Sequence, residues 1–101
     1  MVIVKVTFNI PDDQDLLSLT EKFLENAEIY GETDGLIRKN YICDIENSVA
    51  GGFYCFETYK SAKEWFDDDR IRWLEERYSK PEIQYFENPV VVDNTADQII
   101  H

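Results

Sequence analysis

Histidine is almost absent from this chain, in which the single one, His101, is the last residue. A hydrolytic triad needs a histidine base inside the folded domain, so that class of active site is excluded. Two cysteines without a nearby histidine also make a poor metal site. The acidic run Asp67 to Asp69 lacks the alternating oxygen ligands and the glycine of a calcium loop. We therefore expect no bound metal.

Basic residues and long apolar runs are also scarce. Lys and Arg number 10 against 21 Asp and Glu, which gives a formal net charge of -11. Such a charge repels polyphosphates and anionic lipid surfaces, so we expect neither a nucleic-acid partner nor a membrane partner. The chain has no 18-residue apolar run and no basic, apolar leader. We expect a cytoplasmic protein, in which Cys43 and Cys55 stay free thiols because that compartment is reducing.

Linkers rich in glycine and serine, low-complexity tracts and internal repeats are missing as well. A length of 101 residues suits one domain with a small core. The composition, 44% hydrophobic and 31% charged, is typical of a folded globular protein. We therefore expect residues 1–101 to form a single domain, in which a tail from about residue 93 reaches a partner subunit.

The first half of the chain predicts a strand, a helix and a second strand. Apolar residues alternate with others from Val2 to Ile10, which is the period of a strand. Apolar residues then recur at helical spacing from Leu16 to Tyr30, until Gly31 ends the helix. Gly35 opens the second strand.

The second half repeats the pattern after a turn that ends at Gly51, the first of two adjacent glycines. Phe53 to Glu57 should form the third strand, and Thr58 should cap the helix that follows. Asp69 is expected to cap a further helical segment, Arg70 to Tyr78. The last strand begins near Ile83 and is interrupted at Asn88-Pro89 before it continues through Val90 to Val92.

The order βαββαβ predicts an α+β, ferredoxin-like fold. Two crossover connections then generate a four-stranded antiparallel sheet of order 4-1-3-2, with the helices on one face. The other face would carry residues such as Ile3 into water. A second copy of the chain is the simplest cover for it, so we expect a homodimer.

The stretch from Gly35 to Ala62 carries the most specific pattern. A glycine opens a long strand that contains Lys39 and Tyr41, and an Asn-x-x-Ala-Gly-Gly turn, an aromatic strand and a Ser-Ala helix start follow. This pattern resembles the YdhR-like monooxygenase family of the dimeric α/β-barrel superfamily. The resemblance implies a dimeric α/β barrel. It also implies oxygenase chemistry on small aromatic or quinol-like molecules without a metal or flavin cofactor.

Some relatives in that superfamily bind and degrade haem, through an asparagine, a tryptophan and a helix histidine. Asn9 and Trp65 occupy positions similar to the first two, but Glu75 stands where the histidine ligand would be. Haem degradation by that route is therefore not expected.

An oxygenase of this kind must take the proton from a phenol and hold the resulting anion in a dry pocket. Lys39 and Tyr41 lie two residues apart on one strand, so their side chains share a face and could bind the reactive oxygen as catalytic residues. Asn9, Tyr54 and Trp65 are the candidate substrate-binding residues.

Each candidate also has a structural interpretation. Lys39 could protect an exposed strand edge, and Tyr41, Tyr54 and Trp65 could simply pack in the core. Asn9, just before Ile10-Pro11, could be only a strand-end or turn residue. If the other face of the second strand pointed inward, Arg38 and Asn40 would replace Lys39 and Tyr41. The sequence therefore leaves two functions open, a monooxygenase and a non-catalytic dimer that binds a small ligand or serves a structural role.

Overall fold

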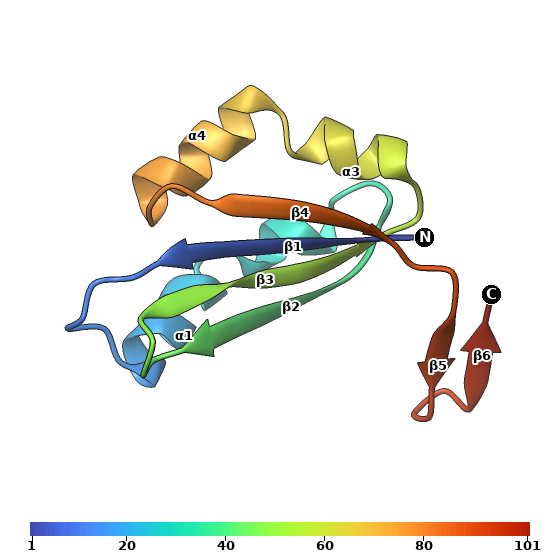
Figure 1. Ribbon diagram of the computed structural model, residues 1–101, viewed down its shortest axis with the longest axis horizontal. Coiled ribbons are helices and arrows are strands. Elements are labelled where there is room, and N and C mark those ends of the chain that lie inside the picture. Colours follow the sequence, from blue (N-terminus) through green and yellow to red (C-terminus); the bar gives the residue numbers. More distant parts are fainter.

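The computed structural model describes all residues from Met1 to His101. The chain forms a βααββααβ body followed by a C-terminal hairpin (Figure 1). The elements are β1 (Val2–Asn9), α1 (Leu16–Leu24), α2 (Ala27–Gly31), β2 (Leu36–Asp44), β3 (Val49–Phe56), α3 (Tyr59–Trp65), α4 (Asp68–Arg77), β4 (Glu82–Glu87), β5 (Val91–Asp93) and β6 (Gln98–Ile100).

The four long strands form one antiparallel sheet in the order β2-β3-β1-β4. Read from the other edge, this is the expected order 4-1-3-2, so the α+β, ferredoxin-like fold is confirmed. The central strands β1 and β3 pair over the full length of β1, from Val2 opposite Phe56 to Asn9 opposite Val49. Strand β2 lies at one edge of the sheet and is hydrogen-bonded on one side only.

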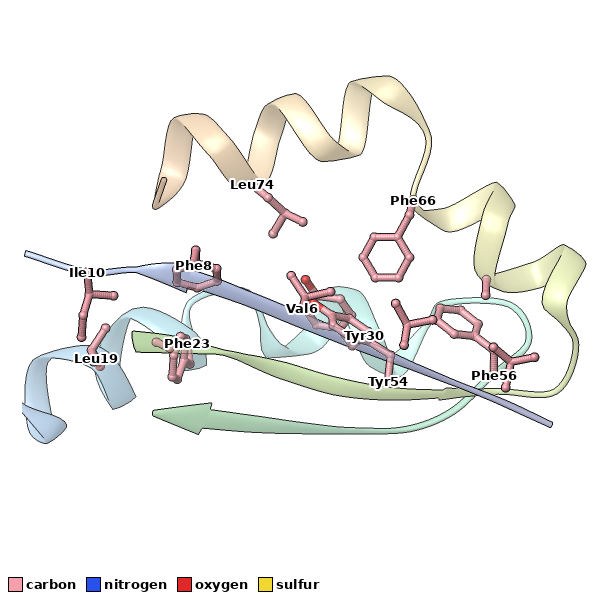
Figure 2. Close-up of a cluster of buried hydrophobic side chains, with 14 residues drawn as sticks. Val6, Phe8, Ile10, Leu19, Phe23, Tyr30, Tyr54, Phe56, Phe66 and Leu74 are labelled. Atoms are coloured by element: carbon pink, nitrogen blue, oxygen red, sulfur yellow. The ribbon is translucent and has the colours of Figure 1, made fainter. Parts of the chain in front are cut away.

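The core lies between one face of the sheet and the helices (Figure 2). Val2, Val4, Val6 and Phe8 of β1 are all buried, and the residues between them are only half-buried. This alternation follows from the two-residue period of a strand. Figure 2 shows Leu74 and Phe66 reaching this face from the helical side. The core is rich in aromatic side chains, and some of them also belong to the candidate site.

The helices begin at polar caps. Asp15 caps α1 by accepting a hydrogen bond of 2.8 Å from the backbone N–H of Ser18, and Thr58 caps α3 as expected. Asp67 rather than Asp69 caps α4, because its carboxylate reaches the N–H of Arg70 at 2.8 Å. The single helix expected from Leu16 to Tyr30 is two helices, α1 and α2.

The turn between β2 and β3 differs from the prediction. Glycine was expected to make it, but Gly51 and Gly52 both lie inside β3. The turn spans residues 45–48, where Ser48 adopts a positive φ of 54° and the Asp44 carboxylate accepts hydrogen bonds from Asn47. Gly51 and Gly52 therefore do not make the turn, and each has a steric role inside β3 instead.

The C-terminal segment also departs from the prediction. After Pro89 the chain does not continue β4; β5 pairs instead with β6 in a separate two-stranded sheet that projects from the body (Figure 1). Pro89 lacks the N–H that the ladder would need, which is consistent with the break. No helix of the structure has the length and apolar character that crossing a bilayer requires.

Candidate active site

The site centres on Lys39 in the edge strand β2. Lys39 lies directly opposite Tyr54 of β3, and Tyr41 lies opposite Gly52. The register shifts between Leu36 and Arg38, where β2 contains one extra residue. Beyond this irregularity, Lys39 and Tyr41 point toward the helices, because their partner positions belong to the buried face of β3. The sequence alone left this orientation open.

Three tyrosine rings surround the amine of Lys39, and we call them the tyrosine cage. The Lys39 Nζ lies 3.5 Å from the ring centroid of Tyr30, 3.8 Å from that of Tyr41 and 4.5 Å from that of Tyr54. The rings of Tyr30 and Tyr54 also meet edge to face, with centroids 5.7 Å apart. Electron-rich ring faces attract a cation, so the cage can hold the amine when it carries a proton.

Gly52 provides the space for this arrangement. A β-carbon at this position would lie 3.0 Å from Cε of Lys39 and 3.3 Å from a ring carbon of Tyr54. The hydrogen of glycine therefore lets the lysine stem pass over β3 toward the cage. Gly51 has a different purpose, because a β-carbon there would overlap the backbone oxygen of Val6 on the neighbouring strand.

Burial lowers the pKa of Lys39 from its ordinary value of 10.5 to about 6. No carboxylate forms an ion pair with this amine, and the amine makes no hydrogen bond. At neutral pH Lys39 is therefore mainly a neutral amine, which has a free electron pair. A neutral amine can accept a proton from a bound molecule, and the ring faces then stabilise the ammonium that results.

The hydroxyl of Tyr41 is the one buried side-chain polar atom without a hydrogen-bond partner. Its ring stacks on Phe23 with centroids 4.6 Å apart, which fixes the ring plane. Burial raises the pKa of Tyr41 above its ordinary value, so the hydroxyl keeps its proton at neutral pH. An orphaned buried donor costs about 1–3 kcal/mol, which indicates that a ligand oxygen could be its missing partner.

Two hollows are lined by Lys39. The inner cavity lies between sheet and helices, is lined by Lys39 and all three cage tyrosines, and measures about 10 Å³, enough for about one water. The β2–α2 groove lies outside it, measures about 300 Å³ and is lined by Ala27, Tyr30, Gly31, Leu36, Ile37, Arg38, Lys39 and Tyr41. Because Lys39, Tyr30 and Tyr41 border both hollows, they form the wall between them.

The remaining predicted residues fall in different places. Tyr54 is 2% exposed and belongs to the cage. Trp65 contacts the cage through Tyr30, with ring centroids 5.4 Å apart, and Arg70 covers its other side at 3.8 Å. Asn9 is exposed on the opposite face of the sheet, so this chain does not bring it to Lys39.

Two residues of the site, Tyr30 and Gly52, were not predicted from the sequence. Tyr30 looked like the last member of an apolar helix stripe, although its ring lies nearest to the Lys39 amine. Gly52 looked like part of a turn, although it makes room for the lysine stem. The cross-strand register could have revealed Gly52, but the register depends on where the turn lies, and that was misplaced. Arg38 and Asn40, the alternative pair, are exposed and hydrogen-bond each other at 3.1 Å.

Solved structures share this fold at low sequence identity. A "putative antibiotic biosynthesis monooxygenase" from Deinococcus radiodurans matches with a TM-score of 0.66 and 13% identity, covering 92% of this chain and 97% of its own. A monooxygenase from the gene ActVA-Orf6 of Streptomyces coelicolor, in complex with nanaomycin D, matches with a TM-score of 0.67 and 15% identity over 90% of this chain and 89% of its own. A structural-genomics protein, YJCS, matches with a TM-score of 0.57 and 14% identity, covering 85% of this chain and 98% of its own.

The sequence itself points to a family. No curated protein matches the chain. Residues 2–92 match the model of the family described as "Putative mono-oxygenase ydhR", which covers the whole βααββααβ body and ends within the C-terminal hairpin. The chain therefore belongs to the ydhR monooxygenase family.

Proposed function

We propose that the protein is a monooxygenase that oxidises a small phenol or hydroquinone without a metal or flavin. The observation that carries the proposal is the pairing of a neutral, partly buried lysine amine with an unpartnered, buried tyrosine hydroxyl on two residues that line one groove. Family membership adds support, and so does the small-molecule ligand, nanaomycin D, named for the ActVA-Orf6 monooxygenase.

Substrate would bind in the β2–α2 groove. A volume of about 300 Å³ is at the lower end of the range for ligand pockets and suits a single aromatic ring. The inner cavity, at about 10 Å³, cannot hold one unless side chains move. The aliphatic side chains of Leu36 and Ile37 would contact the ring faces, and the phenol oxygen would point toward Lys39 and Tyr41.

The chemistry then needs only these residues and dioxygen. The amine of Lys39 takes the phenol proton, and the ammonium and the Tyr41 hydroxyl stabilise the phenolate. The electron-rich ring reduces dioxygen and forms a carbon–oxygen bond to it. The O–O bond then breaks. One oxygen atom stays on the ring, so that a phenol becomes a quinone and a hydroquinone becomes a hydroxyquinone, and the other leaves as water with the proton held by Lys39 and the hydrogen of the attacked ring carbon.

We further propose that the active form is a homodimer. Ile3, Ile42, Phe53 and Phe86 lie on the sheet face that the helices leave open, and Phe53 and Phe86 are 39% and 48% exposed. A second copy on this face would remove them from water and complete the barrel that the resemblance implies. Asn9 would then lie in the dimer interface.

Oxygen consumption tests the proposal. Purified protein would be mixed with a panel of phenols and hydroquinones in an oxygen electrode, and the rates would be compared with those of Lys39→Met and Tyr41→Phe. Lys63 and Tyr85 provide a matched control, because Lys63 Nζ lies 4.1 Å from the Tyr85 ring on an exposed helix. Lys63→Met and Tyr85→Phe should keep full activity.

Either of two results would overturn the assignment. If both site variants consume oxygen as fast as the unchanged protein, Lys39 and Tyr41 have no catalytic role. If the unchanged protein binds members of the panel but consumes no oxygen above the buffer blank, the non-catalytic ligand-binding alternative replaces the enzyme.

A further inference from the structure

Lys39 differs from the other five lysines in its surroundings. Lys22 donates to the backbone oxygen of Arg77 at 2.9 Å, Lys60 pairs with Glu64 at 3.8 Å, and Lys63 and Lys80 are exposed. Lys5 lies on the open sheet face. Only Lys39 has its amine enclosed by aromatic rings at the end of a groove, without a carboxylate beside it.

We propose that Lys39 is also a nucleophile, which condenses with a small neutral aromatic aldehyde in the β2–α2 groove to form an imine. This activity goes beyond the proposed oxygenase reaction, because it needs no dioxygen and no oxidation. It would make the groove a carbonyl-binding site.

The bond changes are those of a simple condensation. The lone pair of Nζ attacks the carbonyl carbon, and the carbonyl oxygen becomes a hydroxyl by taking a proton. That hydroxyl then takes the second amine proton and leaves as water while the carbon–nitrogen double bond forms. Burial without an anionic partner favours the unprotonated amine that the first step requires.

Tyr41 is placed to assist this reaction. Its ring lies 3.8 Å from Nζ, and its hydroxyl has no partner in the structure. Because the Tyr41 ring borders Nζ, we expect its hydroxyl to reach the oxygen of a carbonyl group bound there and to donate a hydrogen bond to it. Tyr41 is therefore expected to speed the condensation without being essential to it.

The groove and the charge of the protein select the aldehyde. Ala27, Leu36 and Ile37 contribute apolar wall, which suits an aromatic ring. The net charge of -11 disfavours keto acids and phosphorylated aldehydes. A neutral aryl aldehyde has an aromatic ring, a carbonyl group and no charge, so it meets all three requirements.

Reductive trapping tests the proposal. The full chain would be incubated with benzaldehyde and cyanoborohydride between pH 5 and 8, under nitrogen, and adducts would be located by peptide mapping. We expect a single benzyl group on Lys39 at neutral pH, with an extent that rises as pH passes about 6. Labelling of the Met1 α-amino group, also a target near neutral pH, would be measured separately as the internal reference.

Four variants make the test more specific. Lys39→Met and Lys39→Arg should lose the adduct at this position, and Tyr41→Phe should keep it at a rate about tenfold lower. Lys63→Met should leave labelling of Lys39 unchanged, although Lys63 also lies over two rings. Even labelling of all six lysines, or none at Lys39, would overturn the proposal.

The two proposals can fail independently. An adduct on Lys39 together with an absence of oxygen consumption for every phenol would retain the imine site and reject the oxygenase. Oxygen consumption that depends on Lys39, without any adduct, would show that the amine moves protons but does not attack carbonyl carbons.

Discussion

Cε of Lys39 lies where only the hydrogen of Gly52 leaves room for it, since a β-carbon there would approach to 3.0 Å. The glycine belongs to β3 and the lysine to β2, so the site depends on the exact pairing of two strands. This relationship ties Gly52 to the position of the amine rather than to a turn.

Gly52→Ala is expected to displace the Lys39 stem by a few tenths of an ångström while the fold persists. The new β-carbon would also lie 3.2 Å from the backbone oxygen of Asn40, so stability should fall by about 1 kcal/mol, and oxygen consumption should fall several-fold. Circular dichroism melting and the oxygen electrode would measure the two effects.

Gly51→Ala serves as the contrasting variant. Its new β-carbon would overlap the backbone oxygen of Val6, so the protein should be strongly destabilised or fail to fold. Equal stability and equal activity in both alanine variants would contradict the assigned roles of the two glycines.

Lys39→Met should make the protein more stable at pH 6 to 7, by about 1–3 kcal/mol. Methionine keeps the stem and removes a partly buried amine that has neither an ion pair nor a hydrogen bond. Urea unfolding would measure the gain. A loss of stability in this variant would mean that contacts between the amine and the rings outweigh the cost of burying it.

The pH dependence of stability should also change in Lys39→Met. In the unfolded chain Lys39 binds a proton up to its ordinary pKa of 10.5, whereas in the folded protein it releases that proton at about 6. The unfolded state therefore binds more protons between these values, and stability must rise with pH by at most about 1.4 kcal/mol per unit. Urea unfolding from pH 6 to 9 should show this slope in the unchanged protein and a smaller one in the variant. Parallel slopes would contradict the lowered pKa.

Tyr41→Phe should keep or raise stability by about 1 kcal/mol, because it removes a buried hydroxyl without a partner. Stacking on Phe23 is retained. If the hydroxyl binds the substrate oxygen, kcat should fall about 10–100-fold in the same variant. A destabilised variant with full activity would show that the hydroxyl has a structural partner instead.

Phe53→Lys should prevent dimerisation. Phe53 lies on the open face of the central strand β3, opposite Lys5, so the variant places a second ammonium beside the first. Sedimentation velocity should show the unchanged protein as a dimer and the variant as a monomer. Thr20→Lys, at an exposed position of α1, is the charge-matched control, and a dimer in both variants would place the interface elsewhere.

Periodicity was sufficient to predict the sheet and most of the helices. The alternation in β1 and the caps at Thr58 and near Asp67 are local signals, and each produced an element in the expected region. Local signals failed where a side chain or a pairing partner decided the outcome. Ser48 took the positive φ that glycine was expected to supply, and β5 paired with β6 instead of extending β4.

The candidate site was also predicted only in part, because local signals placed some of its residues and tertiary packing placed the others. Lys39 and Tyr41 are two residues apart in one strand, so their shared face followed from local geometry. The nearness of Tyr30 depends on how α2 packs on the sheet, which no short pattern encodes. Asn9 was grouped with them through a resemblance, and its own strand period places it on the other face.

The position of β2 at the sheet edge has a kinetic consequence. A strand held on one side only can separate locally at a free-energy cost below that of global unfolding. Such opening events would join the inner cavity to the groove for short intervals while β1, β3 and β4 stay paired. Amide hydrogens of β2 should therefore exchange with deuterium faster than those of β1, and the same breathing motion would set the rate at which a molecule in the groove reaches the inner side of the tyrosine cage.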